Sequence, residues 1–198
     1  MSTDSPLLSS VSTNHDDAIV TGIGSASRED VDSIALRRMD AFAAMALTAA
    51  ERAIADAGIV FSDCDMNRCG VVIASYSGGL ESQIEQHRIM TQRGADRVSA
   101  FLIPKLIINS AAGHIAVQFG LRGPGLGLCD ESATPDSAIQ EGRRWIAAGL
   151  CDVVIAGVAE CVPDRWLDGR VRNCSAETVV LERRSHAARR GVSIRSDR

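Results

Sequence analysis

Six cysteines are the residues of this sequence with the widest chemical options, because a thiol can bind a metal, form a disulfide or act as a nucleophile. No two of them form a C-x-x-C pair, and no histidine stands near them at zinc-finger spacing. We therefore expect no metal site, no structural disulfide and no cofactor. The cysteines are expected to be small core residues: Cys64, Cys69, Cys129, Cys151, Cys161 and Cys174.

Two glycine-rich segments could contact a phosphate group. The segment Gly22-Ile23-Gly24-Ser25-Ala26-Ser27 follows an apolar run, as the dinucleotide-binding fingerprint follows a strand. It lacks the third glycine, and a polar stretch follows in place of a helix. Gly78-Gly79 could hold an anion, but paired glycines more often form a turn. Neither segment predicts a nucleotide site.

Composition limits the class of protein. The chain has 198 residues, a net charge of -4 and 45% hydrophobic residues, which fits one globular domain and gives no reason to expect nucleic acid or a membrane surface as partner. The first residues, MSTDSPLLSSVSTNHDD, lack the basic and apolar regions of a signal peptide. We expect a disordered tail over 1–17, a single domain over 18–198, and a cytoplasmic location.

The pattern of apolar residues predicts alternating strands and helices. The clearest helix runs from Met39 to Gly58, where apolar residues recur every three or four positions and glycine is a natural stop. Further helices are expected over 80–91, 104–119, 134–148 and 183–190. Continuous apolar runs predict buried strands over 18–24, 69–75, 126–130, 152–156 and 178–182. Such strands, separated by helices, indicate an α/β domain with a largely parallel sheet.

Several of these segments resemble the amino-terminal part of β-ketoacyl synthases of the type II fatty-acid and polyketide kind. The matching stretches occur in the order typical of that family and include Val20-Thr21-Gly22-Ile23-Gly24, Ser99-Ala100-Phe101-Leu102-Ile103-Pro104, Asn109-Ser110-Ala111-Ala112-Gly113-His114, Gly120-Leu121-Arg122-Gly123-Pro124, the segment from Asp152 to Glu160, and the segment from Glu177 to Gly191.

The resemblance implies a thiolase-like half, a five-stranded mixed sheet of strand order 3-2-1-4-5 flanked by helices. Enzymes of the family are about twice this long, contain two such halves and work as dimers, and this chain corresponds to the first half. The stretch from Asp164 to Ser175 is shorter than the family's connection between the fourth and fifth strands.

The resemblance also places the nucleophile. The family's cysteine nucleophile follows the third strand, and at that position this chain carries Ser132. A hydroxyl is far less acidic than a thiol and needs an adjacent base. The neighbouring Glu131 would disfavour an oxyanion. We therefore predict no catalytic residue and no enzyme activity for the chain on its own.

The histidines do not offer a replacement base. The family's two catalytic histidines belong to its second half. Here His15 lies in the tail, His87 and His186 are expected on surface helices, and His114 matches a non-catalytic position of the family.

Cys129 could in principle replace the missing nucleophile. It lies three residues before Ser132, and the two-residue repeat of a strand puts it on the opposite face. We expect it to be a small buried core residue.

A chain of this kind is expected to need a partner. The third strand would be a sheet edge, and such edges are usually covered or paired. The helix over 134–148 would expose Ala138, Ile139, Ile146 and Ala147 if nothing packed on it. Type II polyketide systems pair a competent ketosynthase with an inactive relative, the chain length factor, and some polyene-making systems use shortened versions.

By this resemblance the chain is predicted to be a chain-length-factor-like partner that completes the heterodimer and caps the acyl tunnel, with an acyl carrier protein reached through the complex. Leu102 and Leu106, four residues apart, would share a helical face at the tunnel end, unless they are ordinary core leucines. The full set of expected tunnel or partner-interface residues is Phe101, Leu102, Leu106, Ile107, Leu126 and Leu128.

Three alternatives stay open at this stage. Ser132 could be the nucleophile of an acyltransferase or hydrolase, if the partner supplied a histidine base. The chain could be a decayed fragment without function. The basic cluster of Arg183, Arg184, Arg189 and Arg190 could contact an acidic carrier protein, although a solvated helix face is the simpler interpretation.

Overall fold

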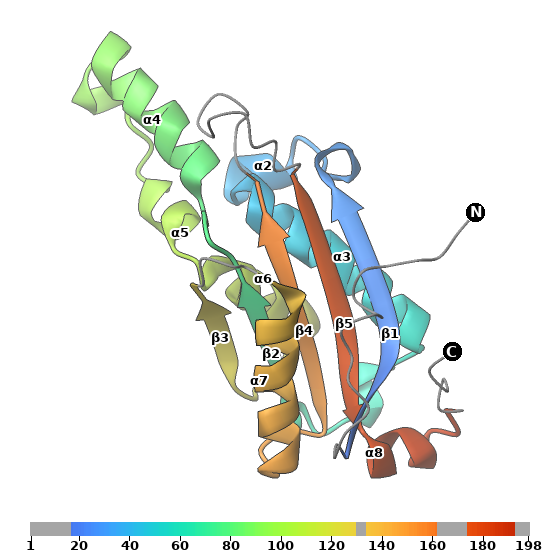
Figure 1. Ribbon diagram of the computed structural model, residues 1–198. Helices are drawn as coiled ribbons and strands as arrows, with labels where there is room; N and C mark the ends of the chain where they lie inside the picture. Colours follow the sequence, from blue (N-terminus) through green and yellow to red (C-terminus); the bar gives the residue numbers. More distant parts are fainter. Residues whose placement is uncertain (1–16, 130–133, 162–173, 193–198) are drawn as a thin grey trace.

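The computed structural model describes residues 17–129, 134–161 and 174–192. Its centre is a sheet of five strands: β1 (Ala18–Ser27), β2 (Cys69–Ala74), β3 (Gly125–Leu128), β4 (Val153–Glu160) and β5 (Ser175–Arg183). Strands β3, β2 and β4 run parallel, whereas β5 is antiparallel to both β4 and β1. The expected mixed five-stranded sheet is confirmed (Figure 1).

The order of the strands along the sheet differs from the expected 3-2-1-4-5. It is β3-β2-β4-β5-β1, so β3 is an edge as expected, but β1 forms the opposite edge. The reason is the antiparallel pairing of β1 with β5 from Ala18↔Arg183 to Ser27↔Ser175. Pairing between strands so distant in sequence leaves no local signal in either of them.

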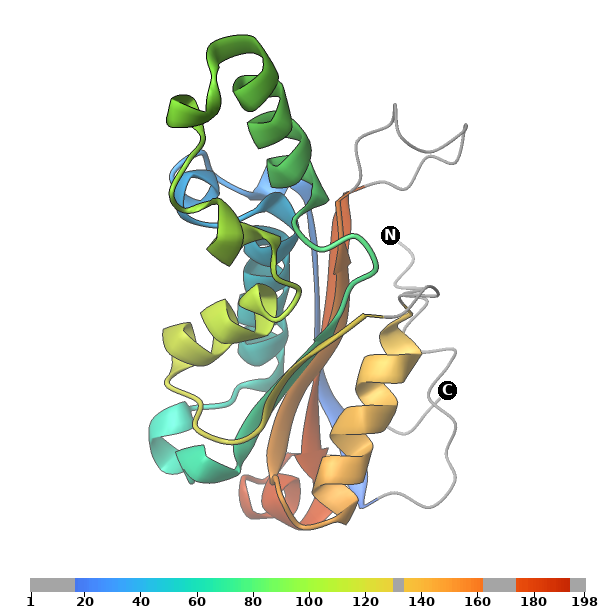
Figure 2. The same cartoon turned by 90° about the vertical axis from the view of Figure 1, so that its left-hand side faces the viewer.

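Helices cover both faces of the sheet (Figure 2). One face packs against α3 (Ala41–Ala57) and α6 (Ser110–Phe119), whose buried residues form the larger hydrophobic cluster with Val71, Ile73 and Ile155. The opposite face packs against α7 (Pro135–Ala147), which forms the second cluster with Val72, Val154 and Leu181. The remaining helices are α2 (Ala35–Arg38), α4 (Leu80–Arg93), α5 (Leu102–Leu106) and α8 (Arg184–Arg189), with short 3-10 turns η1 (Arg28–Asp30), η2 (Phe61–Asp63), η3 (Met66–Arg68) and η4 (Ala95–Arg97).

Small residues bring α3 close to β1. The helix presents Ala49, Ala53 and Ala57 to the sheet, and a Cβ atom built on Gly24 of β1 would overlap the backbone oxygen of Ala49. A glycine is therefore required at this position for steric reasons. Gly22 makes the same kind of approach to Ala53, so the glycines after the first apolar run serve packing and not a nucleotide.

The expected single helix over 104–119 is two helices. Ile107 has an extended backbone (φ -72°, ψ 131°) and ends α5, and α6 begins after Asn109. The connection passes directly over β3, because a Cβ on Gly127 would lie 2.7 Å from the Asn109 backbone nitrogen. This crossing places α5 beside the carboxyl end of β2 and not over the sheet.

The predicted exposed apolar patch on α7 is wrong. Ala138, Ile139 and Ile146 are buried against β2, β4 and β5, and only Ala147 is exposed. The helix lies along the sheet and buries its apolar face there, so it needs no second domain for that purpose.

Candidate functional site

Helix α5 is fixed in place by backbone and side-chain hydrogen bonds on three sides. Lys105 Nζ donates to the backbone oxygen of Leu36, at 2.9 Å. Before the helix, the backbone nitrogen of Ser99 donates to Gln86 Oε1 of α4, at 2.7 Å. At its end, the carbonyl of Leu106 accepts from the backbone nitrogen of Gly79. The segment is therefore held rigidly against α2 and α4.

The outer side of this segment is apolar and uncovered. Phe101 is 71% exposed, Ile103 65% and Ile107 49%. Three large apolar side chains within seven residues form a patch that the described part of this chain does not bury. Patches of this kind usually mark a docking surface. We call Phe101, Ile103 and Ile107 the α5 patch.

Leu102 and Leu106 lie on the other side of the same helix and are half-buried. Neither belongs to the two hydrophobic clusters of the sheet, so the interpretation as core leucines finds no support in those clusters. Leu102 lines a cavity of about 240 Å³ between α2, α4 and α5.

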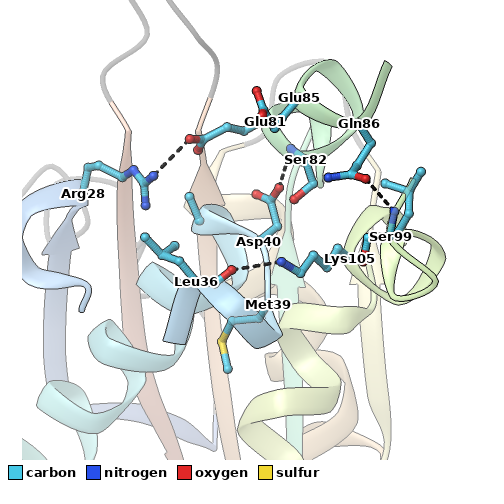
Figure 3. A pocket seen from close by; sticks show the side chains of 12 residues that line it. Arg28, Leu36, Met39, Asp40, Glu81, Ser82, Glu85, Gln86, Ser99 and Lys105 are labelled. Atoms are coloured by element: carbon cyan, nitrogen blue, oxygen red, sulfur yellow. Dashed lines mark hydrogen bonds and ion pairs between the residues drawn. The ribbon is translucent and has the colours of Figure 1, made fainter. Parts of the chain in front are cut away.

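Charged groups around this cavity are held by an ion pair and by hydrogen bonds to the backbone (Figure 3). Arg28 Nη2 lies 3.0 Å from Glu81 Oε1, and Asp40 Oδ2 accepts from the backbone nitrogen of Ser82 at 2.9 Å. Asp40 also caps α3 by accepting from the backbone nitrogen of Phe42. These contacts tie η1, α3 and α4 together, and the charged residues that line the cavity are two basic and three acidic ones: Arg28, Lys105, Asp40, Glu81 and Glu85.

Strand β3 is an open edge next to the α5 patch. Its alternate residues Leu126 and Leu128 are half-buried on the face that carries α7. Val71 N donates to Pro124 O and Ser75 N donates to Leu128 O, so the even-numbered residues bond to β2. By the alternation of a parallel ladder, the backbone groups of Gly125 and Gly127 point outward. Of the expected site residues, the structure thus gathers those on α5 and those on β3 at one side of the sheet.

The parallel strands β2, β3 and β4 have their carboxyl ends at the same end of the sheet. Glu160 at the end of β4 is buried and accepts hydrogen bonds from the backbone nitrogens of Tyr76 and Ser77 and from Ser77 Oγ. Its carboxylate is therefore committed to holding the turn after β2. Ser132 and Glu131 lie outside the described residues, and α7 begins at Pro135 shortly after them.

The prediction that Cys129 is buried is wrong. Strand β3 ends at Leu128, and Cys129 is an exposed free thiol. Because the residue has left the sheet, the two-residue repeat no longer assigns it to a face.

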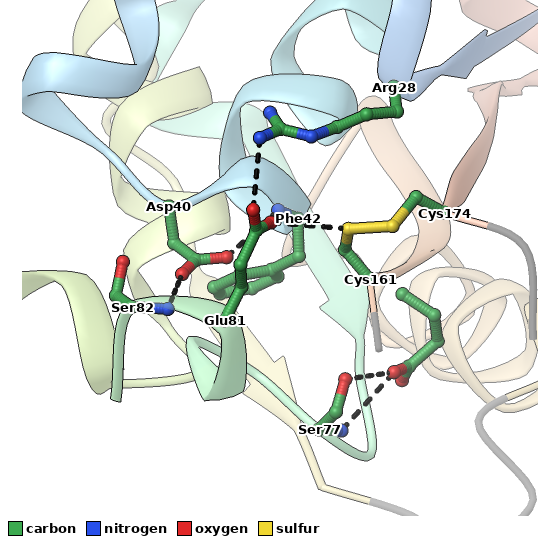
Figure 4. Close-up of a disulfide and its surroundings, with 9 residues drawn as sticks. Arg28, Asp40, Phe42, Ser77, Glu81, Ser82, Cys161 and Cys174 are labelled. Atoms are coloured by element: carbon green, nitrogen blue, oxygen red, sulfur yellow. Dashed lines mark hydrogen bonds and ion pairs between the residues drawn. A yellow bond between two sulfur atoms is a disulfide. The ribbon is translucent and has the colours of Figure 1, made fainter. Parts of the chain in front are cut away.

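The prediction of no disulfide is also wrong, since Cys161 and Cys174 are bonded (Figure 4). The antiparallel register of β4 and β5 ends at Glu160↔Ser175, which sets the next two residues opposite each other with Cα atoms 4.1 Å apart. Cys161 Sγ also lies 3.5 Å from Glu81 Oε2. A separation of 13 residues carries no spacing signature, so only the strand register reveals the pair.

His186 and two arginines of the basic cluster, Arg183 and Arg190, are more buried than a surface helix would make them. His87 is exposed, as predicted, but His186 is buried and its Nδ1 lies 2.7 Å from Glu182 Oε2. Arg190 donates to both oxygens of Glu182, and Arg183 pairs with Asp152. Arg183 and Arg190 of the basic cluster thus form ion pairs within the fold. Arg184 and Arg189 are its exposed members.

Within residues 17–129, 134–161 and 174–192, no three His, Cys, Asp or Glu side chains are grouped so as to hold a metal ion. Over the same residues, no helix combines the length and the apolar character needed to cross a bilayer.

Comparison with known proteins assigns the family. Residues 14–186 match the family described as "Beta-ketoacyl synthase, N-terminal domain". This chain belongs to the β-ketoacyl synthase family. It is 34% identical to 3-oxoacyl-[acyl-carrier-protein] synthase 2 of Rhizobium meliloti (strain 1021), over 80% of this chain and 45% of the relative. The corresponding Vibrio cholerae protein is 30% identical over the same shares. The chain thus spans about half the length of these ketosynthases.

Solved ketosynthase structures share the fold. A ketosynthase of a type II polyketide synthase, in complex with its acyl-carrier protein, superimposes with a TM-score of 0.77, 16% identity, and coverage of 89% of this chain and 66% of that chain. The ishigamide ketosynthase/chain length factor gives a TM-score of 0.74 at 15% identity, over 89% of this chain and 60% of that chain. At such identities the likeness establishes the architecture alone.

Proposed function

We propose that this ketosynthase-family chain is a non-catalytic, chain-length-factor-like partner of a competent β-ketoacyl synthase in type II polyketide or fatty-acid-like biosynthesis. The observation that carries the proposal is the α5 patch beside the open edge of β3. An apolar surface and an unpaired strand edge are both liabilities for a protein that works alone. A ketosynthase subunit docked on this side would cover them together.

The residue at the nucleophile position supports a non-catalytic role. Ser132 stands where the family carries its cysteine. A cysteine thiol has an ordinary pKa of about 8.5, which a helix amino terminus lowers toward neutrality, whereas a serine hydroxyl needs a positioned base. Glu131 beside it adds a negative charge where an oxyanion would develop. Both changes disfavour acyl transfer through this position.

The role proposed for the interface is to close the acyl tunnel of the partner. Leu102 faces a cavity, Leu106 lies one turn further on, and Phe101 and Ile107 extend outward from the same rigid segment. Leu126 and Leu128 continue the apolar surface on β3. A set of apolar side chains on rigid elements suits an acyl chain, and their size would limit its length.

The acyl carrier protein would be reached through the complex. A structural neighbour is a ketosynthase bound to its acyl-carrier protein, which makes this class of partner reasonable here. In this chain, Arg184 and Arg189 are the exposed members of the basic cluster that could meet an acidic surface.

Co-expression tests the heterodimer. The chain is expressed with ketosynthases of its own organism, and complexes are identified by native mass measurement. A stoichiometric soluble pair is expected. Phe101→Glu should weaken it by about tenfold or more, because a charge would be buried in an apolar interface. Leu150→Glu changes an apolar residue that is 52% exposed, outside the α5 patch and β3, and should leave binding unchanged. A chain that stays monomeric with every ketosynthase would contradict the proposal.

Product length tests the tunnel. Leu102→Ala in the reconstituted pair should shift products toward longer chains, because truncating a packed leucine opens a cavity. Leu150→Ala is the matched control and should leave the product profile as it is. An unchanged profile for Leu102→Ala removes the tunnel role while leaving the heterodimer standing. Acyl label found on Ser132, with the partner's cysteine blocked, would replace the non-catalytic role by an acyltransferase.

A further inference from the structure

A second group of reactive residues lies at the end of the sheet where β2 begins and β5 ends. Cys64, a free and half-buried thiol between η2 and η3, has its Sγ 3.8 Å from His186 Nε2. The other ring nitrogen, Nδ1, lies 2.7 Å from Glu182 Oε2. A thiol, an imidazole and a buried carboxylate in this order form the arrangement by which a nucleophile is activated.

The carboxylate fixes the state of the imidazole. Burial alone would raise the pKa of Glu182, but hydrogen bonds from Arg190 and His186 outweigh it and hold the pKa below its ordinary value. An ionised Glu182 accepts a hydrogen bond from an Nδ1–H, and the tautomer that makes this bond carries its lone pair on Nε2. Nε2 lies 3.8 Å from the Cys64 sulfur, whose thiol also reaches the backbone oxygen of Val60 at 3.7 Å. Glu182 is thus a positioning residue and His186 the candidate base.

A second thiol stands next to the first. Cys69, the first residue of β2, donates its thiol proton to the backbone oxygen of Asp65 at 3.3 Å and is near enough to Cys64 for each thiol to influence the pKa of the other. Burial raises the pKa of Cys69 to about 12, so Cys64, which has His186 beside it, is the thiol that reacts first.

Access to the pair is restricted but present. His186 forms part of the wall of a surface cavity of about 550 Å³, which is also lined by Asp63 and Asp65, the residues on either side of Cys64. A small uncharged reagent can reach a half-buried sulfur beside such a cavity, whereas a bulky one is hindered. The charged groups facing the thiol are Arg190 of the α8 end, Glu182 of β5 and Asp63 of η2.

We propose that Cys64 is a peroxide-reactive thiol, with His186 as its base and Cys69 as the residue that resolves the oxidised product. His186 takes the Cys64 proton, and the thiolate attacks one oxygen of hydrogen peroxide. The O–O bond breaks, a sulfenic acid forms, and the leaving hydroxide takes the proton from His186 to give water. The Cys69 sulfur then attacks the sulfenic sulfur while its thiol proton passes to the departing hydroxyl group, so that a Cys64–Cys69 disulfide forms and a second water is released.

Two electrons pass from the two thiols to the peroxide, so no further reductant is needed. Because burial raises the pKa of Cys64, little thiolate exists at neutral pH without assistance. Cys129 is a free thiol that is exposed to solvent and serves as the internal comparison. Preferential oxidation of Cys64 at neutral pH would therefore require the base, and this preference is the property to measure.

The test treats the full chain with limiting hydrogen peroxide at pH 7 and maps the cysteines by peptide mass. A Cys64–Cys69 disulfide should form before Cys129 is oxidised. In Cys69→Ala, dimedone should trap a sulfenic acid on Cys64. His186→Asn should slow the reaction about 100-fold, at the low end of what a positioned base contributes. Cys151→Ala removes another buried thiol and should change nothing.

Two results would overturn the proposal. One is oxidation of Cys129 ahead of Cys64 in the unaltered chain, which needs no variant to fold. The other is a His186→Asn protein that is folded by circular dichroism and oxidises Cys64 at the unaltered rate.

Discussion

At the scale of single residues, Asp152 links three parts of the chain. Its Oδ2 lies 2.6 Å from Arg68 Nε and its Oδ1 lies 2.8 Å from Arg183 Nε. Its backbone carbonyl accepts from Arg183 N and its backbone nitrogen donates to Arg68 O. The hydrogen bonds from Arg68 and Arg183 hold the pKa of Asp152 well below its usual range. The residue thereby joins η3, the start of β4 and the end of β5.

Asp152→Asn should lower the free energy of unfolding by about 1–2 kcal/mol at pH 7, since the carboxylate charge that accepts three hydrogen bonds from two arginines is removed at a side chain that is partly exposed. A depressed carboxyl pKa contributes stability above the unfolded value of about 4, and that contribution is lost as pH falls below it. Urea unfolding between pH 7 and pH 2 measures both effects. Glu141→Gln, in an exposed pair with Arg144, should change stability by less than about 0.5 kcal/mol. Equal losses in the two variants would contradict this assignment.

Sequence reasoning at this scale succeeds where the signal is local. Gly58 ends α3 in a left-handed conformation, as its position after an alanine-rich helix predicts. It fails for Cys161, Cys129 and His186. The pairing of Cys161 depends on the register of two strands, the exposure of Cys129 on where β3 ends, and the burial of His186 on a carboxylate from β5. None of these determinants lies beside the residue in the sequence.

At the scale of elements, β3 and α5 are the parts whose surroundings the described chain leaves incomplete. The periodicity of the sequence predicts the five strands and most of the longer helices near their observed places, because amphipathic patterns are a local property. It misses the short helix α2 and joins α5 and α6 into one helix. It does not predict that α7 covers the sheet while the α5 patch stays uncovered. That outcome depends on the crossing of Asn109 over Gly127, which turns α5 away from the sheet.

The outward edge of β3 can be tested without disturbing the fold. Gly125→Pro removes a backbone N–H that points away from β2, and proline is tolerated at strand edges. A Cβ at this position meets only Val71 Cγ1 at 3.9 Å, so the side chain fits. The expected result is a loss of ketosynthase binding of about tenfold or more with little change in thermal stability, measured by titration and by melting.

Gly125→Ala is the matched control, because it keeps the N–H and adds nearly the same bulk at Cβ. It should bind as the unaltered chain does. If Gly125→Pro binds equally well, the β3 edge is not paired in the complex, and the α5 patch alone would have to form the interface.

At the scale of the whole molecule, the close contact between the α3 layer and the sheet sets the thickness of the domain. The edge strand β1 approaches α3 at Gly22 and Gly24, and the helix has alanines on the side that faces them. The strand and the helix are therefore so close that a Cβ atom on either glycine would overlap the helix backbone. The small-residue face is visible in the sequence, but its contact with β1 is not, because β1 reaches that place only by pairing with β5.

Gly24→Ala should therefore destabilise the whole domain by about 2–3 kcal/mol, because the new methyl group overlaps the Ala49 carbonyl and forces α3 away from the sheet. For a chain of this length the expected fall in Tm is roughly 5–10 °C. Gly113→Ala makes the same chemical change inside α6, where a Cβ meets nothing within 4 Å, and should raise stability by about 0.5–1 kcal/mol. If Gly24→Ala lowers the stability and Gly113→Ala raises it, the spacing between the helix layer and the sheet, and not the number of glycines, limits the stability of the domain. A Gly24→Ala protein that melts with the unaltered chain would mean that the α3 layer can shift at no cost.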